Sequence, residues 1–126
     1  MYNKELMLEF SIKHAKYYWR LALKKFPELK HYGDMPEFKM NARLTAIGGR
    51  AWLDSNFIDL SCYLLERNWE TYKKEVIPHE LCHFIAYRLF DDKGHGLNWK
   101  YVMEEMGLEP NRCHSMITKY QSEKGN

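Results

Sequence analysis

The chain has 126 residues, of which 45% are hydrophobic and 29% charged, and its mean hydropathy is −0.62. This balance excludes a disordered chain, and no apolar run approaches the roughly 18 residues that a transmembrane helix needs. Nineteen basic and seventeen acidic side chains leave a formal net charge of +2, which permits a nucleic-acid partner without requiring one. The length predicts a single domain, 1–126, with a polar tail from about residue 119.

Two features of the sequence predict its compartment. Charges at Lys4 and Glu5 interrupt the N-terminus before the apolar segment of a secretory signal could form. The three cysteines, Cys62, Cys82 and Cys113, are odd in number and form no CxxC pair. We therefore expect reduced thiols, neither a zinc ribbon nor a thioredoxin-type motif, and a cytoplasmic protein without a membrane partner.

The first predicted element is a helix from Lys4 to Phe26, which Pro27 ends. Its predicted core face carries four apolar residues, namely Leu6, Phe10, Tyr17 and Leu21. A second face carries a basic stripe of Lys13, Lys16, Arg20 and Lys24 at helical spacing. A solvated surface is the simpler interpretation of this basic stripe, and contact with the phosphates of DNA is the alternative.

A strand-like pattern follows the loop around Gly33 and Pro36. Apolar residues alternate with polar ones at Phe38, Met40, Ala42 and Leu44. The short apolar segments 50–53 and 57–60 flank the sequence Asp54-Ser55-Asn56, which is typical of a hairpin turn. We therefore predict a three-stranded antiparallel sheet.

Two helices are predicted in the second half of the chain. The first runs from Trp69 to Phe90 with Asn68 as its N-cap, and Pro78 predicts a kink or a new first turn within it. After a turn at 91–96, the second runs from Leu97 to Met106 and ends at Gly107. Its predicted inner side is formed by Trp99, Val102, Met103 and Met106. The predicted fold class is α+β, with the first helix and the sheet packed on the long helix.

The long helix contains an HExxH motif, His79-Glu80-Leu81-Cys82-His83. Four helical residues turn about 40° past a full turn and rise about 6 Å, so the two imidazoles point the same way and can share one ion. Glu80 can reach a water on that ion without ligating it, whereas Leu81 faces the core. The motif predicts a zinc site, and a fortuitous pair of buried histidines is the alternative.

A catalytic zinc ion needs a third protein ligand and one open position. The longer HExxHxxGxxH pattern is not followed here. A glutamate of the next helix, Glu104 or Glu105, is one candidate. We favour His95, because a glycine on each side of it allows the backbone to reverse tightly and carry the imidazole back over the long helix.

These residues resemble the SprT-like metallopeptidase family over roughly Met40 to His114. The resemblance rests on five segments, which are GRAWL at 49–53, IDL at 58–60, EVIPHELCH at 75–83, HGLNWK at 95–100 and RCH at 112–114. It implies a minimal zincin-like fold with zinc on His79, His83 and His95 and with Glu80 as general base. Eukaryotic members degrade proteins crosslinked to DNA, which suggests a similar class of protein substrate here.

The sequence departs from the fuller family pattern in one respect. Many members carry a C-terminal zinc ribbon that engages DNA, and we expect none here, since the chain up to Asn126 holds no cysteine pair for it. Two alternatives stay open. One is a non-catalytic DNA-associated zinc adaptor in which Cys113 or His114 closes the coordination sphere, and the other is an intracellular peptidase without DNA dependence.

Smaller features receive simpler interpretations. We expect Cys82 to be a small buried hydrophobic residue rather than a redox switch. The tryptophans Trp52, Trp69 and Trp99 are predicted to be core and wall residues. His14 and His31 have no spacing relation to the motif.

Overall fold

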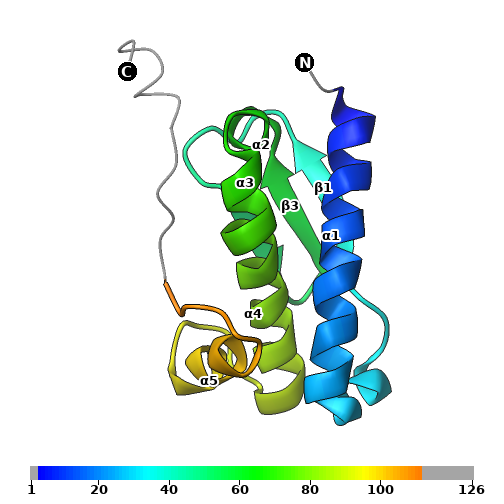
Figure 1. Ribbon diagram of the computed structural model, residues 1–126, viewed down its shortest axis with the longest axis vertical. Helices are drawn as coiled ribbons and strands as arrows, with labels where there is room; N and C mark the ends of the chain where they lie inside the picture. Colours follow the sequence, from blue (N-terminus) through cyan, green and yellow to red (C-terminus); the bar gives the residue numbers. More distant parts are fainter. Residues whose placement is uncertain (1–2, 112–126) are drawn as a thin grey trace.

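Residues 3–111 are described by the computed structural model, so Cys113, His114 and the predicted tail lie outside the described residues. The α+β class is confirmed. The elements in chain order are α1 (Lys4–Lys25), the 3₁₀ turn η1 (Pro27–Tyr32), β1 (Glu37–Asn41), β2 (Gly49–Trp52), β3 (Phe57–Ser61), α2 (Cys62–Arg67), α3 (Trp69–Thr71), the π-helical η2 (Tyr72–Val76), α4 (Ile77–Phe90) and α5 (Leu97–Glu105). Figure 1 shows α1 and α4 side by side in front of the sheet, with α5 at the lower end of α4.

The helix predicted at the N-terminus is confirmed, but its predicted core face is wrong. Leu6, Phe10 and Tyr17 are exposed. The buried stripe consists instead of Met7, Ser11, Ala15, Trp19 and Ala22. Small side chains on this stripe let α1 approach its neighbours closely, and the Ser11 hydroxyl is satisfied by donating to the Met7 carbonyl. The basic stripe is exposed, as a solvated face would be.

The three strands are confirmed, but the prediction of a fully antiparallel sheet is wrong. The strand order is β1-β3-β2, in which β2 pairs antiparallel with β3 and β1 pairs parallel with it. The predicted hairpin turn joins β2 and β3, with Asn56 at a φ of 59°. β3 lies between β1 and β2 in the sheet. The connection 42–48, which joins β1 to β2, therefore has to pass the end of β3. Ser61 holds this connection, since its hydroxyl donates to the Leu44 carbonyl and its N–H to the Gly48 carbonyl.

A helix that the sequence reasoning missed, α2, follows β3 directly. Its N-cap is Ser61, whose hydroxyl oxygen accepts from the Leu64 N–H at 3.0 Å. Asn68 precedes the next helix as predicted, but its side chain does not cap it. The Asn68 amide donates instead to the Leu64 carbonyl and so closes α2.

The long helix predicted from Trp69 to Phe90 is one helical run interrupted by the π-helical turn η2, which ends at Val76, two residues before Pro78. A π-helical register would pair the Pro78 nitrogen with the Lys73 carbonyl, but proline has no N–H to donate. The Tyr18 hydroxyl of α1 donates to that carbonyl at 2.8 Å. The proline therefore causes a local change of register, and α1 satisfies the carbonyl that is left over.

The core lies between the helices and one face of the sheet. Strand residues Ile58 and Leu60 point into it, as do Leu81 and Cys82 of α4, and all four are fully buried. The predictions that Leu81 faces the core and that Cys82 is a buried hydrophobic residue are thus confirmed. None of the described helices combines the length and apolar character that crossing a lipid bilayer requires.

The outer face of the sheet carries a buried carboxylate, Asp59 on β3. Arg50 donates to it through two nitrogens at 3.2 and 2.7 Å, Asn41 at 3.0 Å and the indole N–H of Trp52 at 3.3 Å. Burial by itself raises the pKa of Asp59, but these hydrogen bonds outweigh it, so the pKa lies below its ordinary value. Trp52 itself is 41% exposed and stacks on Phe57, so of the two predicted positions, core and wall, it does not occupy the core.

We predict that Asp59→Asn lowers the free energy of unfolding by about 1–3 kcal/mol at neutral pH, because charge-assisted hydrogen bonds from Arg50 are lost. The pKa of Asp59 is lower in the folded protein than in the unfolded chain, where it is about 3.9. The stability that this difference contributes is complete above the unfolded-state pKa and is lost as the pH falls through the folded-state pKa. Thermal unfolding of parent and variant from pH 7 to pH 3 should therefore show a gap in Tm that closes in acid. The exposed Asp54→Asn is the control. A gap independent of pH would contradict this role.

Candidate metal centre

Three imidazoles converge at one point between α4 and the segment that precedes α5. The Nε2 atoms of His79 and His83 lie 3.1 Å apart, and that of His95 lies 3.1 Å from the first and 3.0 Å from the second. His79 and His83 are buried, while His95 is half-buried. These are the three histidines that the sequence analysis names, and together they could hold a metal ion.

The spacing of the three nitrogens suits a tetrahedral metal. Zinc binds imidazole nitrogen at about 2.0–2.1 Å, which places two ligand nitrogens of a tetrahedron about 3.3 Å apart. The observed separations of 3.0 to 3.1 Å are a few tenths of an ångström shorter. Small rotations of the rings are therefore enough to accept an ion. Ligation itself stays a prediction, as does the identity of the metal as zinc.

The other candidates for a third ligand lie elsewhere. Glu104 and Glu105 are exposed on α5, and neither belongs to the metal-binding group that the described residues form. His14 packs against Trp69 and His31 is exposed, so neither joins the cluster. Among residues 3–111, the geometry favours His95.

Glu80 lies beside the cluster without belonging to it. One of its carboxylate oxygens is 4.0 Å from the Nε2 of His79, and the residue is 6% exposed. Among the described residues, the group that could hold a metal consists of the three histidines and does not include Glu80. The position agrees with the role of a base that acts on water.

Burial of the cluster favours neutral imidazole at His83. Burial and then the neighbouring His95 lower the pKa of His83 to about 4, against smaller opposing effects of Asp92 and a backbone hydrogen bond with Gly94. Neutral imidazole is the form that ligates a metal. Burial raises the pKa of Glu80 to about 8, and the charge of Asp59 adds to this rise. The positive charge of a bound metal would act in the opposite direction.

The cluster opens into a hollow of about 230 Å³ under the start of β2. Besides the three histidines and Glu80, its lining consists of Ile47, Gly48 and Gly49. Tyr72 of η2 fixes this wall, because its buried hydroxyl donates to the Gly48 carbonyl at 2.6 Å. The sequence reasoning treated the two glycines as a break before the strand and missed both their place in the site and the role of Tyr72. The glycine doublet was the only signal for them.

Gly49 is tightly surrounded by its neighbours. A Cβ atom there would lie 3.0 Å from Leu60 Cδ2, 3.2 Å from the Asp59 carbonyl oxygen and 3.4 Å from Glu80 Cγ. We predict that Gly49→Ala strains the contacts with Leu60 and the Asp59 carbonyl and lowers the free energy of unfolding by about 1–3 kcal/mol, as overpacking typically does. Metal content should stay close to that of the parent, since no histidine of the cluster is touched. Thermal unfolding and elemental analysis check this, and parental stability in the variant would contradict it.

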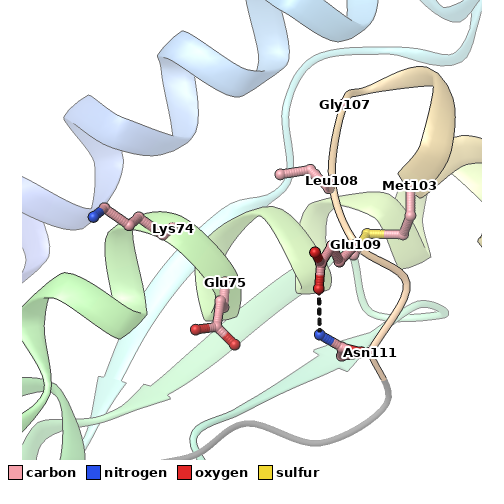
Figure 2. Close-up of a pocket in the computed structure, with 7 residues that line it drawn as sticks. All are labelled: Lys74, Glu75, Met103, Gly107, Leu108, Glu109 and Asn111. Carbon is pink, nitrogen blue, oxygen red and sulfur yellow. Dashed lines mark hydrogen bonds between the residues drawn. The ribbon is translucent and has the colours of Figure 1, made fainter.

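A separate hollow of about 340 Å³ lies away from the histidines. Figure 2 shows Lys74 and Glu75 on the helical segment that leads into α4, opposite the chain that follows α5. On that chain Asn111 donates to Glu109 at 3.5 Å. Among residues 3–111, no histidine or cysteine lines this hollow. It therefore does not compete with the three-histidine cluster as the candidate site.

Comparison with known proteins assigns the family. The SprT-like family matches residues 14–119. Proteins named Protein SprT from Salmonella newport (strain SL254) and Salmonella heidelberg (strain SL476) are each 39% identical over 87 residues, which are 68% of this chain and 52% of the relative. The chain thus spans about half the length of these curated relatives. No solved structure matches it. The family match and these relatives together show that the chain belongs to the SprT-like family.

Proposed function

We propose that this protein is a zinc-dependent metallopeptidase that cleaves proteins bound or crosslinked to DNA. The observation that carries the proposal is the convergence of three imidazole nitrogens within 3.1 Å of one another, with the Glu80 carboxylate 4.0 Å from one of them. Three histidines with space for a fourth ligand are typical of catalytic rather than structural zinc. Membership of the SprT-like family supports the same activity.

In this mechanism His79, His83 and His95 hold the metal and Glu80 moves protons. A zinc ion, when bound, would polarise the scissile carbonyl and lower the pKa of a nearby water toward 7. Glu80 takes a proton from that water as it attacks the peptide carbonyl, and then returns the proton to the leaving amine. Because Glu80 is 6% exposed, bulk water does not compete for its carboxylate.

The sheet offers a means of holding the peptide beside these groups. β2 is an edge strand, and among residues 3–111 no strand pairs with its free edge. Its first residue, Gly49, lies against Glu80. An extended substrate that adds to this edge by main-chain hydrogen bonds would carry a peptide bond past the histidines.

The basic stripe on α1 is the surface that we propose for DNA. Lys13, Lys16, Arg20 and Lys24 are all exposed at helical spacing. Contact with the phosphate backbone would bring DNA-bound protein to the enzyme, and such binding weakens steeply with salt.

The test is a proteolysis assay on a DNA-binding protein with no DNA, with single-stranded DNA and with double-stranded DNA. We expect cleavage that chelators abolish and DNA increases, and a gel shift that weakens between about 50 and 200 mM salt. Arg20→Glu should weaken the shift, whereas Lys30→Glu, on η1, is the matched control. Cleavage that ignores DNA would identify a general peptidase. Zinc binding without any cleavage would favour the adaptor.

A further inference from the structure

The indole of Trp99 contacts all three imidazoles of the metal centre. Its ring centroid lies 5.0 Å from that of His79, 5.5 Å from that of His83 and 4.6 Å from that of His95. The indole is nearly parallel to the His83 ring, at 19°, and perpendicular to the His95 ring, at 89°. Trp99 is fully buried. One side chain therefore restrains every ring of the cluster.

Trp99 is better fixed than the ligand it supports. It lies on the first turn of α5, which packs on the core through Val102 and Met103. His95, in contrast, lies on a segment whose neighbours 93, 94, 96 and 97 are exposed, with a glycine on either side. Glycine restricts the backbone less than other residues do, so contact with the fixed ring of Trp99 contributes to where this imidazole points.

The contacts that hold Trp99 are those of its ring. Among the described residues its buried indole N–H has no hydrogen-bond partner. The contacts that the described residues make with Trp99 are therefore contacts with its flat ring. This separates the role of the ring, which phenylalanine can partly supply, from that of an indole N–H, which it cannot.

We propose that Trp99 is a positioning residue that holds the three imidazoles converged before the metal binds, and so sets the affinity for it. The inference rests on the metal site of the proposed function. Side chains that become ordered only when the metal binds lose conformational entropy, and this loss lowers the affinity. Ligands that are already held in place avoid that loss. Residues that orient metal ligands from outside the coordination sphere typically contribute 10- to 100-fold in affinity.

The first experiment measures zinc affinity by competition with a chromophoric chelator, with the stability of the metal-free protein measured in parallel. Trp99→Leu should bind zinc about 10- to 100-fold more weakly, and Trp99→Phe should stay within about threefold of the parent. Trp19→Leu is the matched control, because Trp19 is a buried tryptophan of the same core whose ring neighbour is Arg88. It should lose stability but keep parental zinc affinity.

Parental affinity in Trp99→Leu, or an equal loss in Trp19→Leu, would overturn the proposal. A second measurement tests the proposal without a variant, in case Trp99→Leu does not fold. NMR of the metal-free parent should show close contacts between indole protons and ring protons of all three histidines. Contacts that arise only after zinc is added would show that the metal, and not Trp99, orders the rings. A parent that binds no zinc would instead refute the proposed function itself.

Discussion

We expect Glu80→Gln to abolish most of the proposed peptidase activity while the protein keeps its metal-binding capacity and its fold. The substitution preserves the shape of the side chain but removes the ability to accept a proton. General-base catalysis typically contributes 10²- to 10⁴-fold, and the loss should lie at the upper end because the same carboxylate serves both proton transfers. A neutral amide suits this buried position, since burial already disfavours the charged form of Glu80. Initial rates measure the activity, elemental analysis measures the metal content, and thermal unfolding measures the stability of the fold.

The matched control for this variant is Glu70→Gln, on α3 of the same helical run, whose side chain is exposed and pairs with Lys73. It should retain the parental rate. Cleavage by Glu80→Gln at the parental rate, with a contaminating protease excluded, would refute the proposed mechanism.

His95→Ala should lower zinc affinity by more than about 10²-fold. Loss of a group that merely orients a ligand already costs up to about 100-fold, and a missing ligand removes a metal bond outright. The variant should still fold, because His95 is only half-buried on the segment before α5. Chelator competition provides the affinity, and thermal unfolding without metal checks the fold.

Glu104→Ala and Glu105→Ala are the controls, since both side chains are exposed on α5. Each should keep zinc affinity close to that of the parent. If His95→Ala retained zinc and one of the glutamate variants lost it, the third ligand would be that glutamate, and the converged imidazoles would need another explanation.

The candidate cluster was predictable because it depends on short-range geometry. The spacing of His79 and His83 on one helix determines that their rings share a face. The glycines beside His95 indicated where the chain could turn back, and the structure places its Nε2 within 3.1 Å of both other rings. The end of α5 before Gly107, at a φ of 75°, followed from the same kind of local rule.

The errors concern contacts between elements that lie far apart in the sequence. The core face of α1 was misplaced because Ser11, Ala15 and Ala22 carry little hydrophobic signal, yet small side chains are what allow close packing. Alternation along β1 shows that one of its faces is buried, but not which strand it pairs with, so the parallel pairing with β3 was invisible. The bond from Tyr72 to Gly48 spans 24 residues and has no local signature.

A crystal structure of the zinc-loaded protein, with anomalous data on both sides of the zinc edge, tests the central claim most directly. The account predicts one zinc ion bound by the Nε2 atoms of His79, His83 and His95, with water in the fourth position and hydrogen-bonded to Glu80. Cys113 or His114 in that fourth position would contradict it, because a metal closed by four protein ligands is a structural site and the protein would be an adaptor rather than a peptidase.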